Sequence, residues 1–271
     1  MAGSAAGYPR TVRVLITNDD GIDSAGLRAL ASVAHEAGHQ VAVAAPSWDA
    51  SGASASLTAV EEGGRLLVEE RDLVGLPGVC FYAVEAAPAF IVRAAAVGVF
   101  GTPPEIVLSG INRGPNLGHA VLHSGTVGAA LTASTFGLPS MAVSIGTGSE
   151  VHWETACHVA GLALDALIRS GRPTALNVNV PNVHLDDLKS FEEARLASFG
   201  AIQTTITEQG AGYVKLGYEP MERDAEPGTD VAAYHDGIAC YTPLIACCED
   251  DDAPRLDMPT KLRHTRPLAR R

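Results

Sequence analysis

Short β-branched runs alternate with helical patterns through most of the chain. Residues 12–17 predict a strand that runs into an Asn-Asp-Asp-Gly turn, and Asp23 or Ser24 can then cap a helix that ends at Gly38. A second short apolar run over residues 41–45 predicts the next strand. This order of strand, helix and strand is typical of the start of a parallel, doubly wound sheet.

The same patterns continue to Pro181. They predict helices over residues 88–97, 124–135 and 155–168, strands over 105–109, 140–145 and 175–180, a long Gly/Asn loop over 110–118 and a loose hairpin within 57–70. Further on, residues 197–217 are rich in Thr, Gly and β-formers and predict antiparallel arms, and 237–243 predict a late strand.

We therefore expect an α/β protein with a Rossmann-like, mostly parallel sheet and C-terminal antiparallel arms. Residues 1–10 are expected to be a flexible N-terminus and 11–182 an α/β core. Residues 183–248 are expected to form arms that complete the same domain, and 249–271 a charged, flexible tail.

Composition narrows the class of partner. The chain has 271 residues, 19 Lys and Arg against 31 Asp and Glu, and a formal net charge of −12. This charge argues against binding to nucleic acid or to an anionic membrane surface, because both need clustered cations. No apolar run reaches the roughly 20 residues of a membrane span. With five scattered cysteines and no signal-peptide pattern, the cytoplasm is the expected compartment.

Asp19 and Asp20 directly follow the first predicted strand, at the sheet edge where α/β proteins bind ligands. Two adjacent carboxylates stay ionised together only beside a cation or strong donors. Oxygen ligands of this kind suit Mg²⁺, Mn²⁺ or Ca²⁺. The alternative is an ordinary turn with a helix cap.

Three other loops follow predicted strands or open a helix. Residues 109–118 offer the amide of Asn112 and the guanidinium of Arg113, and residues 47–56 offer several hydroxyls. Residues 123–126 (HSGT) open a predicted helix, where bare amides and hydroxyls can bind an anion. The alternative for Ser124 is a plain helix cap. The HExxH pattern at His35–His39 is rejected as a zinc site, because Gly38 ends the helix that it requires.

Several segments together resemble the SurE family of stationary-phase survival nucleotidases. They are residues 15–21 (LITNDDG), 45–56 (APSWDASGASAS), 109–118 (SGINRGPNLG), 122–127 (LHSGTV), 175–181 (ALNVNVP) and 228–243 (GTDVAAYHDGIACYTP). The resemblance covers about Val12 to Leu244.

This resemblance implies a metal-dependent phosphomonoesterase that hydrolyses nucleoside monophosphates, a 5′-nucleotidase. The family's single divalent metal, Mg²⁺ or Mn²⁺, would be held by Asp19, Asp20, Ser51 and Asn112, and its phosphate pocket would be formed by Ser124, Gly125 and Thr126. Family members form homodimers or homotetramers through exchanged C-terminal arms, which would correspond here to residues 197–217 and the tail. The resemblance thus implies that 11–182 is the catalytic core and 183–248 an oligomerisation extension.

The expected reaction is attack on phosphorus by metal-activated water. Asp20 is the candidate acceptor of the water's proton, and His123 is the candidate donor to the leaving oxygen, unless it is a buried structural histidine. Residues 86–91 lack the Thr and Asp that the family often carries there, and residues 199–217 contain only Phe199 and Tyr213 as aromatics. These departures leave open a non-catalytic nucleotide or sugar-phosphate sensor and a phosphatase for a secondary metabolite.

Overall fold

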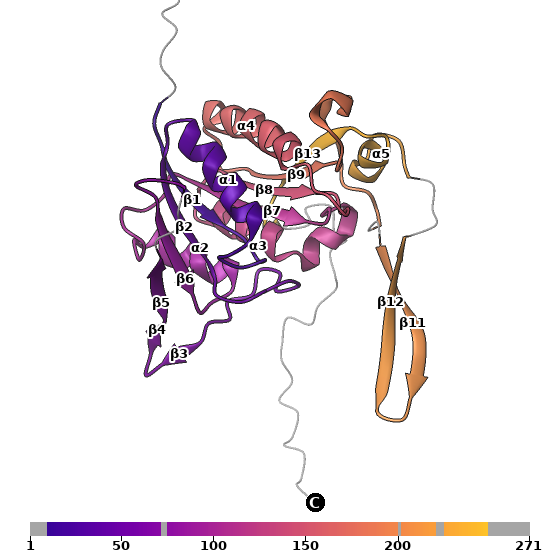
Figure 1. Cartoon of the computed structure of the whole chain (residues 1–271), viewed down its shortest axis with the longest axis horizontal. Coiled ribbons are helices and arrows are strands. Elements are labelled where there is room, and N and C mark those ends of the chain that lie inside the picture. The colour runs from indigo at the N-terminus through magenta and orange to yellow at the C-terminus, as the bar shows by residue number, and fades with distance from the viewer. Residues whose placement is uncertain (1–9, 72–74, 200–201, 221–224, 249–271) are drawn as a thin grey trace, which may run out of the picture.

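The computed structural model describes residues 10–71, 75–199, 202–220 and 225–248. Within them, a nine-stranded sheet forms the centre of the molecule (Figure 1). In spatial order its strands are β10 (Phe191–Glu193), β13 (Ala239–Leu244), β9 (Ala175–Val180), β8 (Ser140–Ile145), β7 (Ile106–Arg113), β1 (Arg13–Thr17), β2 (Gln40–Pro46), β6 (Cys80–Val84) and β5 (Val68–Arg71).

The sheet is mostly parallel and doubly wound, as predicted. Antiparallel pairing occurs between β9 and β13 and between β6 and β5, towards the two margins. From β1 the chain adds β2 and β6 on one side, then crosses to β7 and adds β8 and β9 on the other. The strand order therefore reverses between β1 and β7, and such a switch point is where open α/β sheets bind ligands.

Helices cover both faces of the sheet. Helices α1 (Ala25–Glu36) and α4 (Trp153–Ser170) share one apolar cluster with the sheet, and α2 (Pro88–Ala96) and α3 (Gly125–Thr135) share another. The remaining helical segments are α5 (Asp230–His235) and two 3₁₀ turns, η1 (Gly118–His123) and η2 (Leu185–Asp187). In the described part of the chain, none of the helices combines the length and the apolar character that crossing a bilayer requires.

The C-terminal extension contributes both to the sheet and to an arm. Strands β10 and β13 join the main sheet, whereas β11 (Ile202–Gly210) and β12 (Tyr213–Pro220) form the predicted antiparallel pair. Figure 1 shows this hairpin standing away from the rest of the chain. The predicted tail, and the predicted N-terminal segment apart from Arg10, lie outside the described residues.

One predicted loop is partly wrong. The first four residues of the 110–118 loop continue β7, which pairs with β8 as far as Arg113 after a register shift between Gly110 and Asn112. Gly110 has φ +127°, and a Cβ there would lie 2.3 Å from the carbonyl oxygen of Val143. The glycine therefore allows close passage along β8 rather than marking the start of a loop.

The hairpin expected within residues 57–70 is only partly correct. Strands β3 (Glu61–Glu62) and β4 (Arg65–Leu66) pair as a short hairpin, but β5 pairs with β6, a strand that the pattern did not indicate.

Gly26 sets how closely α1 approaches the strand that leads to Asn112. A Cβ at Gly26 would lie 1.9 Å from the carbonyl oxygen of Ile111. Gly26→Ala should therefore lower the free energy of unfolding by about 1–3 kcal/mol, because a main-chain carbonyl cannot rotate away. The matched control is Gly161→Ala within α4, where the nearest atom lies 3.9 Å away and alanine should be neutral or stabilise by up to about 1 kcal/mol. Equal urea-unfolding midpoints for both variants would contradict the prediction.

Candidate functional site

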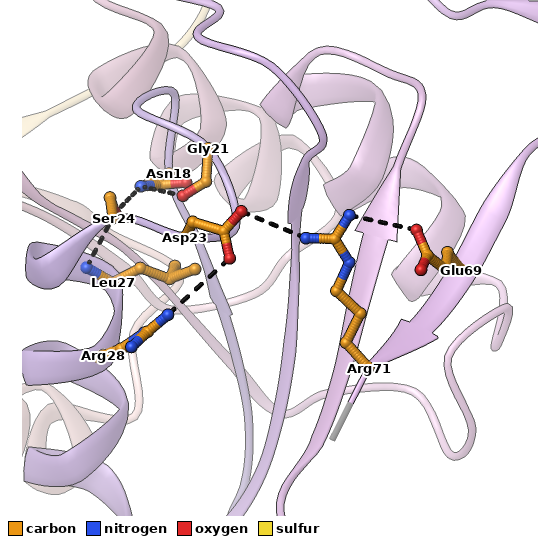
Figure 2. Close-up of polar contacts among 8 residues, drawn as sticks. All are labelled: Asn18, Gly21, Asp23, Ser24, Leu27, Arg28, Glu69 and Arg71. Atoms are coloured by element: carbon orange, nitrogen blue, oxygen red, sulfur yellow. Dashed lines mark hydrogen bonds and ion pairs between the residues drawn. The ribbon is translucent and has the colours of Figure 1, made fainter. Parts of the chain in front are cut away.

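The turn after β1 is held by side chains that connect it to α1 (Figure 2). The Asn18 amide donates to the carbonyl oxygen of Gly21 at 3.2 Å and to the Ser24 hydroxyl oxygen at 2.7 Å. Ser24 also caps α1, because its hydroxyl oxygen accepts from the backbone N–H of Leu27. Of the two predicted caps, Ser24 is the one used. The segment that carries Asp19 and Asp20 is thereby connected to the start of α1.

Asp23 connects the outer side of this turn to neighbouring elements. Its carboxylate lies 3.2 Å from the Arg71 guanidinium in β5 and 3.8 Å from that of Arg28 in α1 (Figure 2). Arg71 also pairs with Glu69. Such exposed pairs each contribute little to the free energy of unfolding.

Asp19 lies inside the protein, against the start of α3. The residue is 4% exposed, and the Thr126 hydroxyl donates to its Oδ1. Burial raises the pKa of Asp19, while the hydrogen bonds from Thr126 and the nearby backbone N–H groups of Thr126 and Gly125 act to lower it. Gly125 has no room for a side chain, because a Cβ there would lie 2.7 Å from Asp19 Oδ2.

Asp20 is half-buried and sits among other charges. Burial, followed by the charges of Asp19 and Asp49, raises the pKa of Asp20 to about 6. The backbone N–H and the side-chain charge of Arg113, at the end of β7, act in the opposite direction. This contact brings Asp20 beside the segment that carries Asn112. Carboxylates crowded in this way are stabilised by a bound cation.

Asn112 presents a neutral oxygen at the same edge. Its Nδ2 donates to the carbonyl oxygen of Gly114 at 2.7 Å, which leaves Oδ1 as an acceptor. Strand β7 pairs with β1, the strand that leads to Asp19 and Asp20. Asn112 therefore comes from the neighbouring strand across the switch point.

The loop after β2 reaches the acidic pair through its backbone. The N–H of Ala50 donates to the carbonyl oxygen of Asp19 at 2.7 Å. Ser51 is exposed, and both its hydroxyl and its N–H donate to Asp49 Oδ1, which lowers the pKa of Asp49. Sequence reasoning did not single out Asp49, although a carboxylate within a serine-rich loop that follows a strand was the available signal.

The predicted phosphate segment, residues 124–126, contacts Asp19 directly. Ser124 is the N-cap of α3, and its hydroxyl oxygen accepts from the N–H of Val127 at 3.1 Å. The Thr126 hydroxyl donates its hydrogen bond to Asp19 Oδ1. His123 ends η1 and is exposed, so the alternative of a buried structural histidine is wrong.

An asparagine cluster that the sequence reasoning missed holds the loop after Asn112. The N–H and Nδ2 of Asn116 donate to Asn179 Oδ1 at 2.7 Å and to the Ser144 hydroxyl oxygen at 2.8 Å. The amides of Asn177 and Asn179 both donate back to the carbonyl oxygen of Asn116. The available signal was the Asn-Val-Asn alternation in β9, which places both amides on one face of the sheet.

Asp230 was also missed, and it connects the C-terminal extension to this loop. Its buried carboxylate accepts from the N–H of Gly118 at 2.7 Å and from the N–H of Ala197 at 2.9 Å. The two backbone segments pass so closely that a Cβ at Gly118 would lie 1.8 Å from the carbonyl oxygen of Phe199. The start of η1, which leads to residues 123–126, is therefore held by the extension.

The departures at residues 86–91 lie in the apolar interior. Ala87 is the N-cap of α2 and forms no side-chain capping bond, and Phe90 packs against the apolar cluster between α2 and the sheet.

The HExxH pattern at His35–His39 does not lie on one intact helix, since α1 ends at Glu36, before His39. This agrees with its rejection as a zinc site.

The donor chemistry at the switch point fits a divalent metal ion. Two carboxylates, an amide oxygen and a hydroxyl are hard oxygen ligands, which Mg²⁺ and Mn²⁺ prefer. The described residues contain no group of three or more His, Cys, Asp or Glu side chains arranged for a metal, so neutral oxygens would have to complete any such site.

Comparison with known proteins gives one consistent result. A family described as "Survival protein SurE" matches residues 14–202. A Stenotrophomonas maltophilia protein named 5′-nucleotidase SurE is 40% identical over 243 residues, which are 86% of this chain and 89% of that protein. A protein of the same name from Nitrosococcus oceani is 37% identical over 86% of this chain and 91% of its own length.

A solved structure supports the same assignment. The SurE protein from Aquifex aeolicus superposes with a TM-score of 0.72 at 29% sequence identity, covering 88% of this chain and 95% of that one. With the family match and these relatives, the chain belongs to the SurE family.

Proposed function

We propose that the protein is a metal-dependent phosphomonoesterase that hydrolyses nucleoside monophosphates to nucleoside and phosphate. The observation that carries this proposal is the pair Asp19 and Asp20 at the β1/β7 switch point, with Asn112 on the neighbouring strand. The relatives named 5′-nucleotidase SurE support the substrate class.

In this proposal, Asp19, Asp20, Ser51 and Asn112 hold one Mg²⁺ or Mn²⁺ ion per subunit. When bound, the ion polarises a phosphoryl oxygen and lowers the pKa of the attacking water. Asp19 is oriented for this role by Thr126. Ser51 is oriented by Asp49, whose carboxylate accepts a hydrogen bond from the Ser51 hydroxyl, so the lone pairs of the Ser51 oxygen stay free.

The residues then divide the proton transfers. Asp20 accepts a proton from the water while the water oxygen forms a bond to phosphorus. At the same time the bond between phosphorus and the nucleoside oxygen breaks. His123 donates a proton to that leaving oxygen, a role that its exposed position at the end of η1 permits. Residues 124–126 contribute to the phosphate site through the positive end of α3 and by holding Asp19.

Assembly is also proposed. Homodimers or homotetramers would form through the β11–β12 arm, which stands away from the sheet and exposes the apolar side chains of Ile206 and Val214 (Figure 1). The cytoplasm stays the expected compartment.

The function is tested by metal-dependent phosphate release. After treatment with EDTA, we expect no release from AMP or GMP, and recovery on addition of Mn²⁺ or Mg²⁺. Asp20→Asn should lower turnover by about 10²–10⁴-fold, as loss of a general base does, and Asp19→Asn should also weaken Mn²⁺ binding measured by calorimetry.

The control for these variants is Asp165→Asn, which removes an exposed carboxylate from α4. Full turnover in both site variants would refute the site. Saturable AMP binding without phosphate release would favour the sensor, and a preference for other phosphate esters over every nucleotide would favour the specialised phosphatase.

The Thr126 hydroxyl should support metal affinity through Asp19. Thr126→Val removes the donor at nearly constant volume and should weaken Mn²⁺ binding by about 10–100-fold, as loss of a partner behind a metal ligand does. Thr126→Ser should restore it. Thr132→Val, whose hydroxyl donates to a backbone carbonyl further along α3, is the matched control. An unchanged dissociation constant in Thr126→Val would exclude this role.

His123→Gln should slow nucleotide hydrolysis by about 10²–10⁴-fold, because the leaving oxygen loses its proton donor. His119→Gln alters another exposed histidine of η1 and serves as control. A wild-type rate in His123→Gln would remove the acid role.

A further inference from the structure

A cavity of about 400 Å³ opens directly beside Asp20. The start of α1 forms one wall, with Ser24 among its residues, and Arg113 at the end of β7 forms another. Ser149, Val151 and Trp153 close it from the segment that enters α4. Its size falls within the roughly 300–1,000 Å³ of ordinary small-molecule sites.

The cavity and α3 adjoin different members of the acidic pair. Asp19 contacts the start of α3 through Thr126, whereas Asp20 lines the cavity. A phosphate held at this pair would therefore have the start of α3 beside Asp19 and the open cavity beside Asp20. Whatever the phosphate is esterified to can extend into the cavity.

The lining has the mixed chemistry of a nucleoside site. Trp153 is partly buried and packs against the core between α1 and α4, so its ring is held in place while it lines the cavity. An indole ring stacks on any nucleobase, since every base has a π-face. Ser24 and Ser149 offer hydroxyls, and Arg113 adds a cation that can stack or donate.

We propose that this cavity binds the nucleoside part of the substrate and that Trp153 stacks on the base. Trp153 is then a specificity-determining residue that favours nucleotides over phosphate esters without a base. Because one stacking face does not distinguish among bases, the site accepts purine and pyrimidine nucleotides alike. This inference rests on the proposed hydrolysis of nucleoside monophosphates.

The test compares AMP with ribose 5-phosphate, which has the phosphate and the sugar but no base. Trp153→Leu should lower kcat/KM for AMP by about 5–150-fold relative to kcat/KM for ribose 5-phosphate, the loss expected for one stacked base. Trp153→Phe keeps an aromatic ring and should restore most of the preference. Phe136→Leu, at the opposite end of α3 from the site, should leave both values unchanged.

A second readout does not depend on catalysis. The chain has two tryptophans, Trp48 and Trp153. Adenosine should quench the tryptophan fluorescence of the wild type. It should not quench that of Trp153→Phe, in which Trp48 is the remaining tryptophan. Circular dichroism confirms that each variant is folded. If Trp153→Leu changes both substrates equally and adenosine causes no such quenching, the inference is wrong. If quenching occurs but no phosphate ester is hydrolysed, the proposed function fails and the nucleoside site stands.

Discussion

The contact between the buried carboxylate of Asp19 and the start of α3 is the constraint on which the rest of the site depends. A carboxylate placed inside a protein costs several kcal/mol unless hydrogen bonds replace its water. Here the Thr126 hydroxyl and the first N–H groups of α3 offset part of that cost, and burial still raises the pKa of Asp19. The same contact requires glycine at position 125, since any side chain would occupy the space of the carboxylate. Strand β1 and helix α3 are therefore placed relative to each other by Asp19, which is also a residue of the candidate site.

Two adjacent aspartates consequently occupy different environments. Asp19 faces inward and is surrounded by donors, while Asp20 faces a cavity and feels the charges of Asp19 and Asp49. Repulsion within this group would oppose folding if no cation were bound. Charge crowding of this kind favours a role in binding over a role in stability, because stability alone would be better served by neutral side chains.

The loop after Asn112 is also fixed by residues that lie far away in sequence. Asn116 is held by amides from β9, and Gly118 is held by Asp230, which is 112 positions further along the chain. The C-terminal extension therefore has two roles: β10 and β13 widen the sheet, and Asp230 fixes the start of η1. The buried Asp230 carboxylate accepts hydrogen bonds from three backbone N–H groups, two of them in the distant segments of Gly118 and Ala197, so displacing either segment would leave it without one of its partners.

The order and type of the central elements followed from the sequence alone. Strands β8 and β9 match their predicted bounds, and Ser24 was one of two expected caps, because β-branched runs and capping residues are local signals. The sequence also indicated that the acidic pair and the segment with Asn112 lie at one edge of the sheet, since the carboxyl ends of parallel strands meet there. Their assignment to a metal came from the family resemblance and stays a prediction. Tertiary structure alone decided that Gly110 continues β7, that Thr126 faces Asp19, and that Asn177, Asn179 and Asp230 hold the neighbouring loop. The physical reason is that these features depend on close packing between segments that are distant in sequence. The hydrophobic periodicity of one segment does not indicate how closely another segment packs against it.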